Sequence, residues 1–199
     1  MSKRIHTITA AAFAGLLTLA PAFAQHQGHD MSKMDHKDSM QLTSQDSKFI
    51  KEAAEGGMME VELGRLATQK AASADVKTFG QRMVDDHSKA NDQLKSIATQ
   101  KGVTLPTTLP ADMRQAMDKM AKLSGAEFDK MYMGHMVKDH KKDVAEFEKE
   151  STKASDSTLK SFVQNTLPTL REHLQMAQTI APKVGAMSGD HDMHGKSGH

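Results

Sequence analysis

The chain has 199 residues, enough for one domain with extensions, and its 26 basic and 25 acidic residues give a net charge of +1. That balance gives no support for a nucleic acid or an anionic membrane as a partner. The absence of cysteine excludes disulfides, thiolate metal sites and a lipoprotein anchor. Aromatic residues make up only 4%, whereas Met occurs 16 times, and Met is both an adaptable core residue and a soft metal ligand.

The first 24 residues have the pattern of a secretory signal peptide. Lys3 and Arg4 form a charged start, residues 5–20 are mostly apolar, and Ala22-Phe23-Ala24 fits an A-x-A cleavage site. We predict cleavage after Ala24 and export to the periplasm. Because the signal carries two of the 26 basic residues, the mature chain has 24 against 25 acidic residues, a net charge of −1. The apolar run is too short for a membrane span, and we expect no transmembrane segment elsewhere.

Two polar tails, residues 25–43 and 183–199, are predicted to be disordered because their apolar content is too low to pack. Six of the eleven histidines lie in them, together with several methionines. Imidazole and thioether groups on such segments suit soft ions such as Cu(I) or Ag(I). The candidate ligands are His26, His29, Met31, Met34 and His36 in the first tail and His191, Met193 and His194 in the second. The alternative is a solubilising tail in which these residues are incidental.

Residues 44–182, between the tails, are predicted to be helical almost throughout. In chain order, the first helix is expected over about 46–70, with Ser44 or Asp46 as its N-cap, and the second from Ser73 to about 101. Two further helices are expected over 111–123 and 126–151. The last should begin near Asp156, kink at Pro168 and end just before Pro182. No segment alternates apolar and polar residues like a strand. Four long helices with short connections predict an all-α four-helix bundle, with the 111–123 helix as an accessory in the longer crossover.

A seven-residue pattern, Met-Val-x-Asp-His-x-Lys, occurs at 83–89 and again at 136–142. At about 100° per residue, the histidine of each copy falls inside the apolar stripe of its helix. The same test finds one inward histidine in the last helix and one inward glutamate in the first. The four long helices are therefore expected to carry Glu60, His87, His140 and His173 on their inner faces.

These four groups allow two interpretations. They can hold one metal ion, or they can form a polar layer in which Glu60 accepts a hydrogen bond from a histidine and Tyr132 assists. Helical spacing predicts faces, not heights along the bundle, so the two interpretations stay open. Asp86, Asp139 and Glu172 each precede an inward histidine. Adjacent helical residues do not face each other, so we expect these carboxylates to be solvated or bound to a neighbouring helix.

Several segments together resemble an exported bacterial family, domain of unknown function 4142, over about residues 46–181. The resemblance rests on Glu60-Val61-Glu62-Leu63-Gly64-Arg65-Leu66-Ala67, on Met83-Val84-Asp85-Asp86-His87, on Phe128, Tyr132 and His140, and on Leu167-Pro168-Thr169-Leu170-Arg171-Glu172-His173-Leu174. It implies a ferritin-like bundle, in agreement with the periodicity, and it implies no established activity.

Ferritin-like di-iron enzymes use a Glu-x-x-His pair on two of their helices. Here Val84, Val137 and Leu170 stand three residues before the inward histidines, so no such pair exists. A dinuclear iron oxidase is therefore poorly supported. One carboxylate and three imidazoles suit a single Zn²⁺ or Cu²⁺ ion better.

We therefore predict a periplasmic metal-binding protein for copper or a similar soft ion, acting in metal sequestration or tolerance through its tails and an internal site. The alternatives are a non-catalytic, stress-related structural bundle with a polar histidine core and a ferritin-like metalloenzyme. The lack of a nucleophile–base motif or a cofactor fingerprint argues against an enzyme. The sequence leaves open the metal, with copper or zinc as candidates, the oligomeric state and any protein partner.

Overall fold

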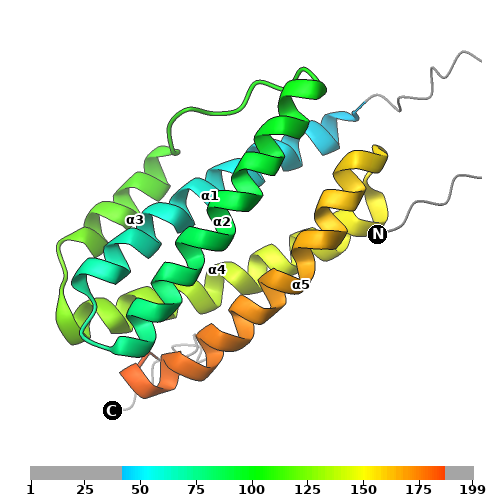
Figure 1. Ribbon diagram of the computed structural model, residues 1–199. Helices are drawn as coiled ribbons and strands as arrows, with labels where there is room; N and C mark the ends of the chain where they lie inside the picture. The colour runs from blue at the N-terminus through cyan, green and yellow to red at the C-terminus, as the bar shows by residue number, and fades with distance from the viewer. Residues whose placement is uncertain (1–41, 187–199) are drawn as a thin grey trace, which may run out of the picture. The chain divides into compact units, whose positions relative to one another are not determined.

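The structure is a computed structural model that describes residues 42–186. The helices are α1 (Ser44–Lys70), α2 (Ala74–Gln100), α3 (Ala111–Ala121), α4 (Gly125–Lys153), α5 (Ser157–Ile180) and the 3-10 helix η1 (Ala181–Val184) (Figure 1). This range contains no β-strand, so the all-α prediction is confirmed. None of the helices in it has both the length and the apolar character needed to cross a membrane.

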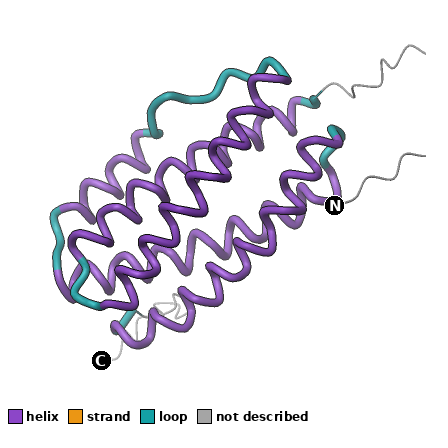
Figure 2. Tube along the Cα trace, in the orientation of Figure 1, coloured by secondary structure: helices purple, strands orange, loops and turns teal. Residues whose placement is uncertain are grey.

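The four long helices form a closed ring. α1 packs against α2 and α4, and α5 packs against the same two helices. Two of the connections are tight turns, whereas residues 101–124 run back along the bundle and include α3, which lies against α1 and α4 (Figure 2). This single long crossover makes α2 and α4 run in the same direction, so that every neighbouring pair in the ring is antiparallel. One crossover is the connectivity of ferritin-like bundles, as predicted.

The first helix begins with a capping box that differs from the predicted cap. Thr43, rather than Ser44 or Asp46, is the N-cap: its hydroxyl accepts from the Asp46 amide at 3.0 Å, and its own amide donates to Asp46 Oδ2 at 3.0 Å. Asp46 occupies the third helical position, where a carboxylate closes the box. Both the amide and the hydroxyl of Ser155 also donate to Asp46. The cap therefore ties the start of α1 to the turn between α4 and α5.

The last helix begins as predicted, because Asp156 accepts a hydrogen bond from the Leu159 amide at 2.9 Å. α5 continues through Pro168 to Ile180. The chain then forms η1, and Ala186 is buried. The packed structure therefore continues to residue 186, four residues past the expected boundary at 182.

The apolar core is divided into two clusters. One lies where α1 and α5 end and includes Leu63, Phe79, Met136 and Ala177. The other lies where they begin and includes Ile50, Leu94, Phe147 and Leu170. On each long helix one buried polar residue stands between the two clusters, and these residues are Glu60, His87, His140 and His173. The inward groups thus form a polar layer across the middle of the bundle.

Glycines let α1 and α2 approach closely beside this layer. A Cβ atom on Gly64 would lie 2.6 Å from the Gly80 carbonyl oxygen, and a Cβ atom on Gly80 would lie 2.6 Å from the Ala67 Cβ. Backbone atoms cannot move aside as a flexible side chain can. The register between the two helices therefore depends on this pair of missing side chains.

We predict that Gly64→Ala and Gly80→Ala each lower the free energy of unfolding by about 1–3 kcal/mol, because the added methyl group overpacks the helix contact. Gly56→Ala is the matched control in α1, since nothing lies within 4 Å of its Cβ position. There the better helix propensity of Ala should raise stability by about 0.5–1 kcal/mol. Urea unfolding of metal-free protein measures all three. Equal stabilities for Gly64→Ala and Gly56→Ala would contradict the close contact.

Candidate metal centre

Three of the inward residues form a compact histidine cluster. His87, His140 and His173 come from α2, α4 and α5 and are 6%, 0% and 0% exposed. One ring nitrogen from each lies within 4.8 Å of the others, and the ring centroids are 5.2–5.8 Å apart. Phe79 packs edge-on against His140 and His173 from the side of the first cluster. This arrangement places the three histidines at one height, which the sequence could not predict.

Each ring is oriented by a partner at one of its nitrogens. His140 Nδ1 lies 3.0 Å from the Met136 carbonyl oxygen, which can only accept, so Nδ1 carries the proton. His87 Nδ1 lies 2.8 Å from Glu60 Oε2. A carboxylate likewise accepts, so His87 also donates through Nδ1.

The third ring is oriented from another helix. His173 Nε2 lies 2.9 Å from Asp86 Oδ2, and Asp86 also accepts from Arg82 Nε at 2.7 Å. The same Arg82 reaches Glu172 Oε2 at 3.0 Å. Asp86 therefore hydrogen-bonds to a histidine of α5 and not to its sequence neighbour His87. This is one of the two arrangements predicted for it, namely binding to a neighbouring helix.

The opposite nitrogens lack a partner. His87 Nε2, His140 Nε2 and His173 Nδ1 are buried, and no donor or acceptor within residues 42–186 hydrogen-bonds to them. A buried polar atom without a partner costs about 1–3 kcal/mol. Metal-binding histidines have this pattern, in which one nitrogen is fixed by a carboxylate or a backbone carbonyl and the other is left for the ion.

Glu60 lies in the same layer but beside the histidine cluster. Its Oε2 pairs with His87, and its Oε1 is 3.3 Å from His140 Nε2 without hydrogen-bond geometry. One carboxylate oxygen of Glu60 lies within 4.8 Å of an oxygen of Asp139 and an oxygen of Asp143. Glu60 does not form such a group with the three histidines. Of the four predicted ligands, three therefore form a nitrogen set, and Glu60 borders it.

The charges in the layer follow from burial and pairing. Burial would raise the pKa of Glu60, but the adjacent imidazoles of His87 and His140 outweigh it and lower the pKa to about 2. For His87, burial would lower the pKa, but the Glu60 carboxylate raises it above the ordinary value. Burial lowers the pKa of His173 to about 4 despite Asp86. At neutral pH, Glu60 is therefore an anion and His173 a neutral imidazole.

Two features of the site were not predicted. In the polar-layer interpretation Tyr132 assists, yet its buried hydroxyl has no hydrogen-bond partner among the described residues. Asp143, which was not singled out, joins Glu60 and Asp139 in a carboxylate group. A usable signal was present, since Asp139 and Asp143 stand one helical turn apart on the same face of the helix.

The predicted tail ligands lie outside residues 42–186. They are His26, His29, Met31, Met34, His36, His191, Met193 and His194.

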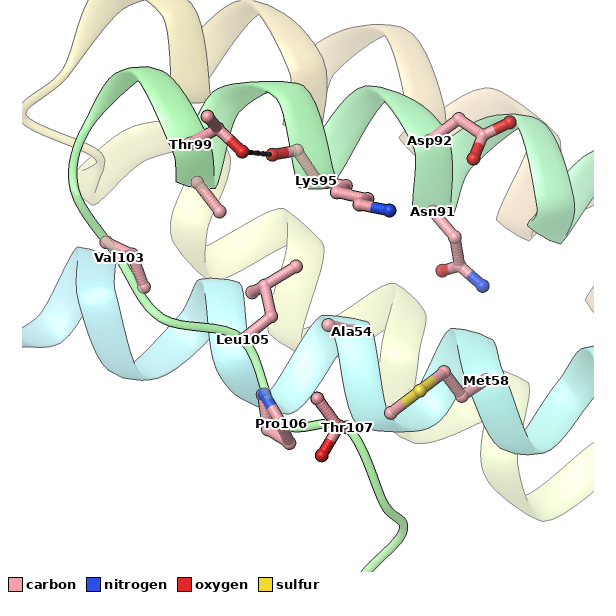
Figure 3. A pocket seen from close by; sticks show the side chains of 11 residues that line it. Ala54, Met58, Asn91, Asp92, Lys95, Thr99, Val103, Leu105, Pro106 and Thr107 are labelled. Atoms are coloured by element: carbon pink, nitrogen blue, oxygen red, sulfur yellow. Dashed lines mark hydrogen bonds between the residues drawn. The ribbon is translucent and has the colours of Figure 1, made fainter.

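Two concave regions lie near the layer. A cavity of about 30 Å³ is lined by Glu60, His87 and Asp143 together with apolar side chains of all four long helices. A groove of about 400 Å³ lies between α1, α2 and the crossover residues 103–107 (Figure 3). Asn91 lines both, and its side chain occupies the space where Gly57 has none. Among the residues that line the groove and the cavity, Asn91 is therefore the only one common to both.

The family model "Domain of unknown function (DUF4142)" matches residues 31–180, and the chain belongs to this family. The predicted resemblance is thereby confirmed. No curated protein matches the chain in sequence.

Solved DUF305 structures share the fold. A DUF305 fragment from Deinococcus radiodurans superposes with a TM-score of 0.63 at 9% identity, covering 71% of this chain and 98% of that one. A DUF305 protein from Streptomyces coelicolor, named as a candidate secreted protein, superposes with a TM-score of 0.64 at 13% identity, covering 75% and 97%. At these identities the likeness concerns the fold alone.

We predict that the Glu60–His87 pair makes metal-free stability depend on pH in a defined way. The lowered pKa of Glu60 contributes stability that is present above its ordinary value of 4.5 and is lost as the pH falls toward about 2. The raised pKa of His87 contributes stability that is present below 6.5 and is lost as the pH rises through its folded value. Between about pH 4.5 and 6.5 both groups are charged in the folded protein. Glu60→Gln should therefore lower the free energy of unfolding most in this range, by about 3–5 kcal/mol, because it leaves His87 buried without its charged partner.

Urea unfolding in the presence of a chelator, from acidic to mildly alkaline pH, measures this difference. Glu62→Gln is the control, because Glu62 is exposed on the same helix and its loss should cost less than about 0.5 kcal/mol. A cost of Glu60→Gln that is the same at every pH would contradict the ion pair.

Proposed function

We propose that the protein binds a transition-metal ion between His87, His140 and His173. The observation that carries this proposal is the orientation of the three rings: each has one nitrogen fixed by a protein acceptor and the other buried without a partner. A bound cation would accept a lone pair from each of the three unpartnered ring nitrogens. It would thereby offset the cost of burying these nitrogens away from water. Because a protein acceptor holds the outer nitrogen of each ring, the inner nitrogen offers its lone pair to an ion whenever the ring is neutral. His87, whose pKa is raised by Glu60, gives up its second proton when the ion binds.

The ligand set limits the class of ion. Three imidazole nitrogens suit Zn²⁺ and copper, whereas Mg²⁺ and Ca²⁺ prefer oxygen. Glu60 borders the three nitrogens, with its Oε1 3.3 Å from His140 Nε2. The methionines of the tails add thioethers, which favour Cu(I) or Ag(I) over Zn²⁺. Together the two ligand sets support copper or a similar soft ion.

In the cell we propose metal sequestration or tolerance in the periplasm, with the tails capturing the ion and the bundle holding it. The signal-peptide pattern of residues 1–24 supports export. The name of the Streptomyces coelicolor neighbour agrees with that direction.

A structural polar core remains the second candidate, and one observation favours it. The ion pair between Glu60 and His87 at 2.8 Å satisfies two of the buried groups without any metal. A core layer of this kind predicts that metal ions change neither the melting temperature nor the histidine environment. Metal-dependent stability therefore separates the two candidates.

We predict that Zn²⁺ or Cu²⁺ stabilises the mature chain, 25–199, in which every tail His and Met has been replaced by Ser. At a hundredfold excess over Kd, one bound ion adds about 2.7 kcal/mol to the free energy of unfolding. His140→Gln should weaken binding more than about 100-fold, because loss of an outer hydrogen-bond partner alone typically costs 10–100-fold. Competition with a chelator and thermal melting measure both effects.

His135→Gln is the matched control, because it makes the same substitution in α4 outside the histidine cluster. It should leave the affinity unchanged. Helicity and melting of the metal-free proteins establish that both variants fold. Equal metal affinity for the two variants, or no stabilisation of the parent, would overturn the proposal and leave the polar core.

For the tails, we predict weak binding of several Cu(I) or Ag(I) ions that does not depend on the bundle. The unchanged mature chain should take up more Cu(I) than the version with Ser at every tail His and Met, whether or not His140 is present. Titration against a Cu(I) chelator provides the measurement. Equal uptake by the two versions would exclude the tails as ligands.

A further inference from the structure

A group of three carboxylates, which includes Glu60, adjoins the histidine cluster. One carboxylate oxygen from each of Glu60, Asp139 and Asp143 lies within 4.8 Å of the other two. Glu60 is 2% exposed, and the two aspartates are half-buried on α4. Three negative charges at this separation inside a bundle repel strongly, so they need protons or a cation.

Two observations besides the cluster point to a cation. Glu60 Oε1 is buried and has no hydrogen-bond partner among the groups of residues 42–186. The cavity of about 30 Å³ is lined by Glu60 and Asp143, and it is large enough to hold a water molecule beside these oxygens. Lys142 of α4 pairs with Glu146 at 3.6 Å. Its charge only partly offsets the burial that raises the pKa of Asp139 and Asp143.

We propose that Glu60, Asp139 and Asp143 form a second metal position, which takes a hard divalent cation such as Mn²⁺. An all-oxygen ligand set selects hard ions, in contrast to the three imidazoles beside it. Glu60 is compatible with both positions, because its Oε2 accepts from His87 while its Oε1 is left for the cation. This position does not require that the histidines bind metal.

The competing arrangement is a set of protonated carboxyl groups. Burial, followed by the charge of Glu60, raises the pKa of Asp139 and of Asp143. Protons could therefore relieve the repulsion when no cation is supplied. The two arrangements differ in whether Mn²⁺ binds to a saturable site.

The experiment follows Mn²⁺ binding to the mature chain, 25–199, by the loss of the free-ion EPR signal. We expect one saturable ion per chain and an increase in Kd of at least about tenfold in Asp143→Asn, equivalent to 1.4 kcal/mol. Asp92→Asn, the same substitution at an exposed position of α2, should leave Kd unchanged. Asp139→Asn is the second variant and decides the outcome if Asp143→Asn does not fold.

Zn²⁺ binding to the same proteins separates this position from the histidine site. In versions of these proteins with Ser at every tail His and Met, Asp143→Asn should leave Zn²⁺ affinity nearly unchanged, whereas His140→Gln should weaken it more than about 100-fold and retain Mn²⁺. The absence of saturable Mn²⁺ binding, or equal Mn²⁺ affinity in the wild type and the folded aspartate variants, would overturn the second position and leave the protonated carboxyls. If a variant loses Zn²⁺ binding but keeps Mn²⁺ binding, the histidine site has been removed and the carboxylate position stands.

Discussion

The burial of a Glu60 carboxylate and three imidazoles in one layer is the constraint on which the rest of the structure depends. Uncompensated charge or polar atoms in a bundle interior cost several kcal/mol. The chain meets part of this cost through the Glu60–His87 pair and through partners at the outer nitrogens of His140 and His173. Three inner nitrogens remain unmatched among the described residues, and this imbalance is the physical basis for a metal ion.

The layer exists because the helices are held in register from several directions. Gly64 and Gly80 fix how closely α1 and α2 approach, one helical turn from Glu60 on α1 and about two from His87 on α2. The Asp46 cap links the start of α1 to the α4–α5 turn through Ser155. At the other end, Asp129 accepts from the amides of the α1–α2 turn at 2.8 and 3.2 Å. These contacts position the site without touching it.

Periodicity predicted the helices and the inner faces because a helix repeats regularly, so one apolar stripe identifies the inward residues. It could not predict heights, which depend on loop lengths and on contacts between distant segments. Asp86 illustrates the difference: helical spacing predicts a residue that is solvated or bound to a neighbouring helix, but it does not identify His173 as the partner. Asp143 was missed for another reason, because a single carboxylate on a charged helix resembles a solvated residue. The capping role of Thr43 depended on recognising Asp46 at the third position.

The most direct test of the account is long-range ¹H–¹⁵N NMR of the histidine side chains, recorded without metal and after addition of Zn²⁺. The structure predicts protons on His87 Nδ1, His140 Nδ1 and His173 Nε2, and Zn²⁺ should shift the opposite nitrogen of each ring. His135, outside the cluster, should not respond. If Zn²⁺ leaves all three rings unchanged, or if the inner nitrogens carry protons at mildly alkaline pH, the layer is a structural polar core and not a metal site.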